Sequence, residues 1–192
     1  MEKSKGLIFG VMTGLLICSF SIAKAGDKKE HTRPNNGTFA GTYLSTRIDV
    51  VDKGDGIAAS WSTAEVTGTL GKRTVQAVTE PKFTGVTAAC PGGVFIIDAQ
   101  NGIGFGTSTA TFPNGDQIYS RILTRTQCGL GAGKFEIDDV QEVVSGTGKF
   151  EGALGTAELH SISFCQASDS KATPPQCFGS FTGEFTGTIT LP

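Results

Sequence analysis

The stretch Gly179-Ser180-Phe181-Thr182-Gly183-Glu184-Phe185-Thr186-Gly187-Thr188-Ile189 alternates phenylalanine, glycine and isoleucine with polar residues. Successive side chains of an extended strand point to opposite faces, so the aromatic residues and most of the glycines share one face and the threonines share the other. Large and small residues alternating along a buried face suit a closed β-barrel, because side chains crowd where the wall curves and glycine lets a strand bend. The stretch therefore predicts a barrel strand.

The pattern Gly-x-Phe-x-Gly occurs three times, at residues 37–41, 148–152 and 179–183, and each copy opens a further alternating stretch. From Gly37 onward no long amphipathic helix is apparent, whereas threonine, valine, isoleucine, phenylalanine and glycine are frequent. The sequence therefore predicts an all-β chain that forms a closed antiparallel barrel of about eight strands. The candidate strands are residues 37–50, 57–70, 73–79, 93–99, 103–112, 116–125, 133–144, 152–165 and 178–191.

Turn-forming residues separate these candidate strands. The clearest turn is Pro113-Asn114-Gly115-Asp116, whose Asn-Gly pair suits the positive φ angles of a two-residue hairpin turn. Residues 53–56 (Lys-Gly-Asp-Gly) and 100–102 (Gln-Asn-Gly) carry similar turn chemistry. We therefore expect neighbouring strands to pair antiparallel.

The first 25 residues have the organisation of a cleaved signal peptide. Two lysines precede an apolar run from Gly6 to Ile22, and Ala23-Lys24-Ala25 supplies a small-x-small cleavage site. The run is short for a retained anchor, and Ile17 is too bulky for a lipoprotein signal before Cys18. We expect a secreted or periplasmic protein with residues 1–25 as signal peptide, 26–36 as a flexible polar lead-in and 37–192 as one barrel domain.

Four cysteines follow the predicted cleavage site, and an even number in an oxidising compartment favours two disulfides. Cys165 and Cys177 flank a polar loop between two strand-like segments, so we expect a bridge that clips this hairpin. Cys90 and Cys128 would then pair by elimination. No Cys-x-x-Cys spacing supports zinc or a redox pair, and we predict neither a metal nor a cofactor.

Residues 143–155, Val-Val-Ser-Gly-Thr-Gly-Lys-Phe-Glu-Gly-Ala-Leu-Gly, resemble the Gly-x-Gly-x-Phe-x-Gly-x-x-Gly turn and strand of allene oxide cyclases and plant dirigent proteins. The resemblance extends over residues 116–164. It implies an eight-stranded antiparallel barrel of the calycin kind, a cavity for hydrophobic small molecules, and homodimers or homotrimers. The cyclases carry polar catalytic groups on N-terminal strands, and residues 41–56 depart from that pattern.

The residues of this motif also have a direct structural interpretation. Gly146 and Gly148 permit a tight turn, and Phe150 is placed to plug the barrel. Gly152 and Gly155 would relieve crowding along the next strand. The motif therefore indicates a fold, and it does not identify an active site.

Tyr119 and Arg121 are the first candidate site residues. They share a strand face in residues 116–125 with Gln117, Leu123 and Arg125. If that face lines the barrel, a phenol and a guanidinium could bind a carboxylate or enone oxygen in an apolar cup. Alternation alone favours the opposite arrangement, with Ile118 and Ile122 pointing inward.

Glu158 and His160 form the second candidate pair, since a carboxylate beside an imidazole could exchange protons with a ligand. The alternative is a surface contact at one end of the barrel. With one histidine in the folded region and no nucleophile around it, the sequence does not indicate a hydrolase.

Two acidic groups and the single tryptophan have plainer interpretations. Residues 49–55 contain three aspartates but lack the spacing of an EF-hand, so a solvated turn is favoured over a calcium loop. Glu136, Asp138, Asp139 and Glu142 form an acidic cluster, of which Glu136, Asp138 and Glu142 share one strand face, and this face is interpreted as solvated. Trp61 is expected to pack in the core or at the rim.

The formal net charge of −2 and the dispersed basic residues argue against nucleic acid as a partner, and no second apolar run could span a membrane. We predict a secreted, disulfide-stabilised barrel that binds a small hydrophobic molecule or serves as a non-catalytic extracellular module. The alternative is a cyclase or isomerase that confines a reactive substrate in its cavity. A third class, an interaction protein, would have a barrel filled with phenylalanine and no cavity.

Overall fold

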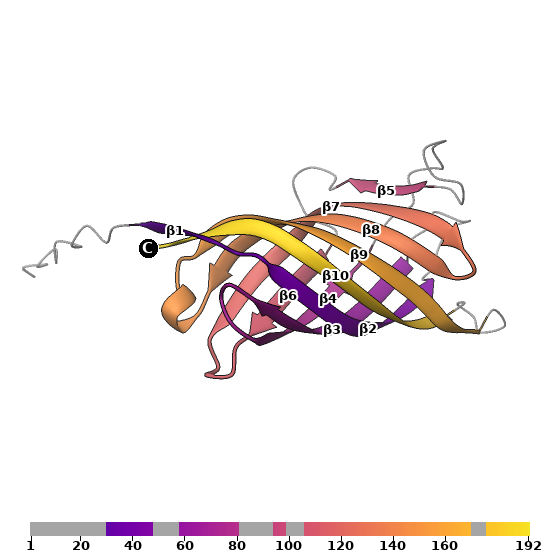
Figure 1. The fold of residues 1–192 in the computed structure, drawn as a ribbon, viewed down its shortest axis with the longest axis horizontal. Coiled ribbons are helices and arrows are strands. Elements are labelled where there is room, and N and C mark those ends of the chain that lie inside the picture. Colours follow the sequence, from indigo (N-terminus) through magenta and orange to yellow (C-terminus); the bar gives the residue numbers. More distant parts are fainter. Residues whose placement is uncertain (1–29, 48–57, 81–93, 99–105, 170–175) are drawn as a thin grey trace, which may run out of the picture.

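A computed structural model describes residues 30–47, 58–80, 94–98, 106–169 and 176–192, and these residues form ten strands and one 3-10 turn. All strand pairs are antiparallel, as the turn-rich sequence predicts (Figure 1). The strands are β1 His31–Pro34, β2 Gly37–Arg47, β3 Ala58–Gly68, β4 Arg73–Thr79, β5 Val94–Asp98, β6 Gly106–Thr111, β7 Gln117–Gly131, β8 Lys134–Gly146, β9 Leu154–Asp169 and β10 Gln176–Leu191.

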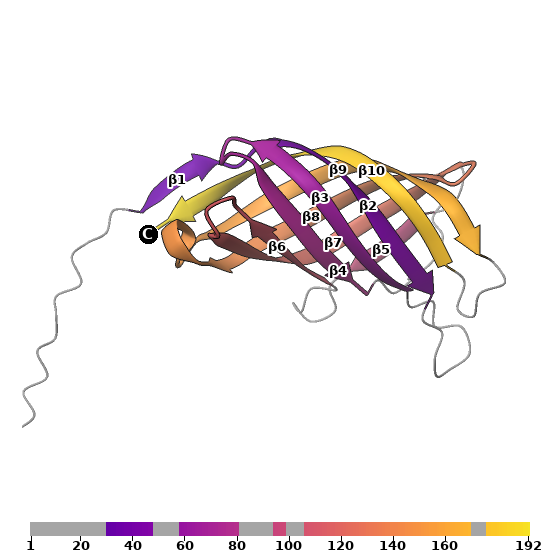
Figure 2. The ribbon, with the colours of Figure 1, turned by 90° about the horizontal axis from the view of Figure 1, so that it is seen from below.

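Eight of these strands close into a barrel, which confirms the predicted fold. The order around the wall is β2-β3-β4-β6-β7-β8-β9-β10, and β10 closes it by pairing with both β9 and β2. Figures 1 and 2 show the strands running obliquely around the wall, with β1 and the C-terminus together beyond one end. Two short strands lie outside the ring, because β1 pairs with the end of β10 and β5 pairs with the end of β7.

The first and last Gly-x-Phe-x-Gly copies pair with each other across the closure of the barrel. Their register sets each aromatic residue of one strand opposite a glycine of the other. Phe39 lies so close to Gly183 that a Cβ added there would come within 2.5 Å of the Phe39 ring. Glycine is therefore required at this close approach. The four pairs, which we call the aromatic–glycine ladder, are Gly37–Phe185, Phe39–Gly183, Gly41–Phe181 and Tyr43–Gly179.

The middle copy of the motif forms the tight turn predicted at Gly146 and Gly148, and Gly152, predicted to begin the next strand, still belongs to this turn because β9 begins at Leu154. Gly148–Phe150 is a 3-10 turn, and Gly148 and Gly152 have φ angles of +58° and +75°. Positive φ is open to glycine and strained for other residues, so here the glycines serve a turn. The turn directs Phe150 into one end of the barrel, where it is 1% exposed and its ring centroid lies 4.6 Å from that of Phe112.

These two rings belong to a hydrophobic cluster that fills this end of the barrel, which we call the closed end. The plug predicted for Phe150 is therefore present. Its buried members are Ala110, Phe112, Ile118, Val143, Phe150, Ala153 and Ile189.

The polar lead-in predicted for residues 26–36 requires a correction. His31–Pro34 forms β1 and pairs residue by residue with Leu191–Thr188 of β10. All four β1 side chains are exposed, so the strand shows no apolar periodicity in the sequence and is held by backbone hydrogen bonding to its neighbour. Residues 26–29, the predicted signal peptide and the predicted turns at 53–56 and 100–102 lie outside the described residues.

The hairpin between β6 and β7 has three loop residues and not the predicted two. The Phe112 N–H donates to Asp116 O and the Gly115 N–H donates to Phe112 O, each at 2.9 Å. Only Gly115 of the Asn-Gly pair has a positive φ, at +87°. This is the geometry of a type I turn followed by a bulge glycine, which leaves the antiparallel pairing intact.

Trp61 lies on the outer face of the barrel wall and is 48% exposed, contrary to the expected core or rim packing. Its cross-strand neighbours Leu44 and Val78 are exposed to a similar degree.

No helix among the described residues has the length and apolar character needed to cross a membrane.

Candidate ligand-binding cavity

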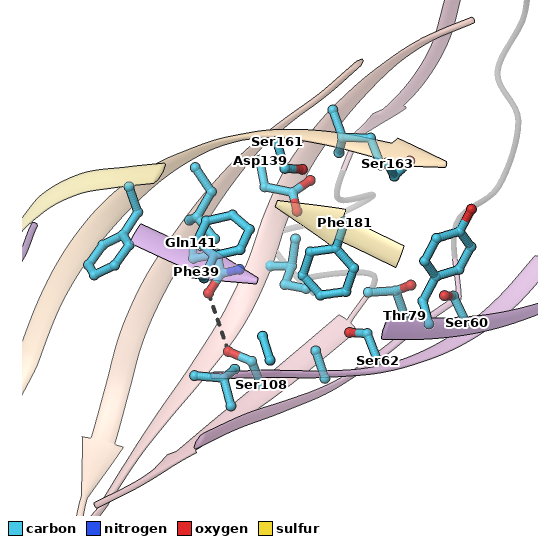
Figure 3. Close-up of a pocket in the computed structure, with 18 of the residues that line it drawn as sticks. Phe39, Ser60, Ser62, Thr79, Ser108, Asp139, Gln141, Ser161, Ser163 and Phe181 are labelled. Atoms are coloured by element: carbon cyan, nitrogen blue, oxygen red, sulfur yellow. Dashed lines mark hydrogen bonds between the residues drawn. The ribbon is translucent and has the colours of Figure 1, made fainter. Parts of the chain in front are cut away.

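The barrel encloses a cavity of about 430 Å³, and every strand of the closed wall contributes lining residues. This volume falls within the range of about 300–1,000 Å³ that is usual for small-molecule sites. A barrel filled with phenylalanine, as expected for a pure interaction protein, is therefore not what the chain forms. Figure 3 shows part of the wall, with Phe39 and Phe181 projecting between polar side chains of opposite strands.

The half of the cavity next to the closed end is mainly apolar. Three phenylalanines of the aromatic–glycine ladder project into it from β2 and β10. Alternating residues of the facing strands complete the lining, because every second side chain points inward. The apolar lining residues include Phe39, Ala64, Val66, Val75, Ile118, Ile122, Leu159, Phe181 and Phe185.

Hydroxyl groups line much of the remaining wall. Ser108 donates a hydrogen bond of 3.2 Å to Gln141 Oε1, the dashed line in Figure 3. The Thr79 hydroxyl is buried and has no hydrogen-bond partner among the described residues, so it is available to a ligand or water. The lining hydroxyls belong to Tyr43, Ser45, Ser60, Ser62, Thr79, Ser108, Ser120, Ser161 and Ser163.

Arg125 and Asp139 form a two-pronged ion pair on the cavity wall. They are direct cross-strand neighbours of β7 and β8, and both N–H···O distances are 2.7 Å. Burial by itself would lower the pKa of Arg125, but the charge and hydrogen bonds of Asp139 outweigh it and raise this pKa above its ordinary value. Arg125 therefore keeps its charge, and Asp139 is its counter-ion.

Arg73 is the second cationic group on the wall, and its surroundings differ. It is 7% exposed, and its guanidinium lies 5.1 Å from the Phe185 ring centroid and 5.7 Å from that of Phe112. It donates to Asn35 Oδ1 and Gly71 O, both at 3.3 Å. Burial lowers the pKa of Arg73 to about 10, so the group stays charged at neutral pH.

At the end opposite the closed end, Tyr43 lies beside the disulfide that joins Cys165 to Cys177. This bridge confirms the predicted hairpin clip. The Tyr43 hydroxyl lies 3.4 Å from Cys177 Sγ, and burial raises the pKa of Tyr43, while a hydrogen bond with Ser163 acts in the opposite direction. Cys128 is also disulfide-bonded, and since Cys90 lies outside the described residues the Cys90–Cys128 pairing stays a prediction.

Tyr119 and Arg121 do not line the cavity. Tyr119 donates a 2.6 Å hydrogen bond to Gln117, and Arg121 forms an ion pair with Glu142 on the outer face. Ile118 and Ile122 point inward, as the alternation favours.

Arg125, however, does not share the face of Tyr119 and Arg121 as predicted. The register of β7 against β8 slips at Leu123, which has no partner in β8. Such a bulge moves all later residues to the other face of the strand. Ile122 and Arg125 therefore both face the cavity.

Glu158 and His160 lie on the exposed outer face of β9, which agrees with the surface-contact interpretation. His160 Nδ1 is 2.7 Å from Asp138 Oδ1, and Glu136 lies 3.7 Å from Nε2. The hydrogen bond with Asp138 and the nearby carboxylates raise the pKa of His160 against a small opposing effect of burial. Glu136, Asp138 and Glu142, the predicted solvated face, do not line the cavity, whereas Asp139 of the same acidic cluster does.

The polar groups that the sequence interpretation missed are Arg73, Arg125 and Asp139. One signal for Arg73 is present in the sequence, because it alternates with Val75 and Ala77, which line the cavity from the same strand. Asp139 carries the same signal, because it alternates with Ile137 and Gln141, which line the cavity from β8. Arg125 carries no such signal, since the bulge at Leu123 is not encoded by a glycine or proline.

No family model, curated protein or solved structure shows significant similarity to this chain.

Proposed function

We propose that this barrel binds a small, predominantly hydrophobic molecule in its cavity. The observation that carries the proposal is the cavity of about 430 Å³ with an apolar half and a hydroxyl-lined half. Protein sites for small molecules commonly combine an apolar lining with a few polar groups that fix orientation.

Binding accounts for this wall better than catalysis does. A cyclase or isomerase that moves protons needs a general base facing its substrate. Among the described lining residues, both oxygens of Asp139 accept hydrogen bonds from Arg125, and Cys165 and Cys177 are joined to each other. The side chains considered for proton transfer, Glu158 and His160, lie on the outer wall.

We further propose that the protein works outside the reducing cytosol and is a divergent relative of the allene oxide cyclase-like barrels. The Cys165–Cys177 bridge supports the first statement, because structural disulfides persist in oxidising compartments. The eight-stranded closure and the glycine-rich turn at Gly148–Phe150 support the second.

The test is a pair of phenylalanine substitutions at adjacent positions of β4. Ala77 lines the cavity, whereas Val78 is exposed on the outer face. We expect Ala77→Phe to weaken binding of the neutral dye N-phenyl-1-naphthylamine about tenfold or more by occupying the cavity, and Val78→Phe to leave it unchanged. The enhancement of the dye's fluorescence measures its binding to both variants. Absence of dye binding to the unmodified protein would contradict the proposal.

A further inference from the structure

Arg73 is a charge that the barrel buries without neutralising it. No carboxylate of the described residues lies within ion-pair distance of its guanidinium, whose hydrogen bonds go to one amide oxygen and one backbone carbonyl. A guanidinium has five N–H donors, so two contacts leave donors unused. Buried charges are normally paired, which makes this arrangement incomplete as it stands.

The cavity wall as a whole has more positive than negative charge. Its described charged residues are Arg73, Arg125 and Asp139, and the last two neutralise each other. Two positive charges and one negative charge leave a net charge of +1, located at Arg73. An occupant with a single negative charge would neutralise the wall.

The position of Arg73 determines how such an occupant would be oriented in the cavity. Arg73 begins β4 and contacts Phe112 of the closed end. Thr79 ends the same strand and pairs with Ser60 of β3. The six residue steps from Arg73 to Thr79 span about 20 Å at about 3.3 Å per residue. Between Arg73 and the hydroxyl-lined part, the wall is apolar.

We infer that the ligand of this cavity is an elongated monoanionic amphiphile whose carboxylate or similar acidic head pairs with Arg73 at the closed end. Its apolar body lies against the phenylalanines of the aromatic–glycine ladder, and its far end reaches the hydroxyl groups. A planar guanidinium can donate two parallel hydrogen bonds to such a head, which gives the site direction as well as charge. This inference rests on the proposed binding function.

The test compares two dyes with the same aromatic body. 8-Anilino-1-naphthalenesulfonate carries a negative charge, and N-phenyl-1-naphthylamine lacks it. We expect the protein to bind the anionic dye about tenfold or more tightly than the neutral one, and Arg73→Met to remove that difference while leaving the neutral dye bound. Arg33→Gln is the matched control, because it removes an exposed arginine from β1 with the same change in net charge.

A second variant keeps Arg73 in place and guards against loss of the fold. Asn35 is 7% exposed and its Oδ1 already accepts from Arg73, so Asn35→Asp supplies the missing carboxylate without changing shape. We expect Asn35→Asp to raise the melting temperature of the protein. It should weaken binding of the anionic dye about tenfold and leave binding of the neutral dye unchanged.

The outcomes separate the two proposals. If both dyes bind alike, and neither Arg73→Met nor Asn35→Asp changes their ratio, the role of Arg73 is wrong while the cavity remains a binding site. If neither dye binds the unmodified protein, the proposed function fails together with this inference.

Discussion

At the scale of the residue, two arginines on one cavity wall show how surroundings decide the state of a charge. Arg125 faces Asp139 across a strand pair, and two 2.7 Å hydrogen bonds fix it. Arg73 faces aromatic rings and an amide, so its positive charge remains uncompensated. A neutralised pair contributes mainly to structure, whereas an uncompensated charge in a cavity is a feature that a ligand can use.

The pairing of Arg125 predicts a large effect of Asp139→Asn on stability. Removing one partner of a buried pair leaves the other charge in a poorly solvated place, and we expect a loss of about 3 kcal/mol in the free energy of unfolding. Urea denaturation measures the change. Glu142→Gln, which breaks the more exposed Arg121–Glu142 pair on the same two strands, is the control and should cost less than about 1 kcal/mol. Equal losses in the two variants would contradict the assignment of Arg125 and Asp139 as a buried pair.

At the scale of the element, the pairing of β2 with β10 closes the barrel through complementary shapes. Each strand presents aromatic residues and glycines on its inner face, and the register sets one against the other. Phe39 and Phe181 thereby pack with ring centroids 5.9 Å apart, at the centre of the apolar lining. The same ladder thus closes the wall and builds the binding surface.

The ladder predicts that Gly183→Ala is destabilising although alanine is small. A Cβ at Gly183 would lie 2.2 Å from His160 O and 2.5 Å from the Phe39 ring, so the backbone of β9 or the ring must move. We expect a loss of about 1–3 kcal/mol, measured by thermal or urea unfolding. Thr182→Ala, at the adjacent outward-facing position, should cost less than about 1 kcal/mol. An unchanged free energy of unfolding in Gly183→Ala would show that the ladder is not tightly packed.

At the scale of the whole molecule, the closed end and the opposite end are stabilised differently. Seven buried residues, Phe150 among them, form a cluster at the closed end. At the other end the long hairpin of β9 and β10 is joined by Cys165–Cys177, and both cysteines line the cavity. Covalent bonding at that end keeps the strands together where the cavity takes the place of a packed core.

The Cys165–Cys177 bridge should stabilise the folded protein, because it closes a loop in the unfolded chain. It spans 12 residues, and the Cys165→Ser/Cys177→Ser variant should lose about 2–3 kcal/mol in the free energy of unfolding. The intact mass of the unmodified protein should lie four hydrogens below that of the fully reduced chain, because Cys128 is bridged as well. Peptide mapping of the remaining bridge tests its predicted partner, Cys90. Unchanged stability in the double variant would mean that the ladder alone holds this end.

Much of this architecture follows from local rules. Alternation with glycine specifies strands, turn residues specify antiparallel neighbours, and the spacing of Cys165 and Cys177 specifies a hairpin clip. These signals depend only on neighbours along the chain, which is why most strand limits agree with those predicted to within four residues, whereas β7 continues six residues beyond its predicted end at 125. β1 escaped prediction because its exposed side chains carry no periodicity.

The sequence by itself determined the barrel, its antiparallel order and the aromatic surface inside it, because a period of two residues and the conformational freedom of glycine are properties of the chain. Only the tertiary structure decided which polar groups face the cavity. A bulge at Leu123 places Arg125 inside and leaves Arg121 outside, and the closing register buries Arg73 against Phe185. Alternation distinguishes two faces of a strand, but which face is inside depends on partners far away in the sequence.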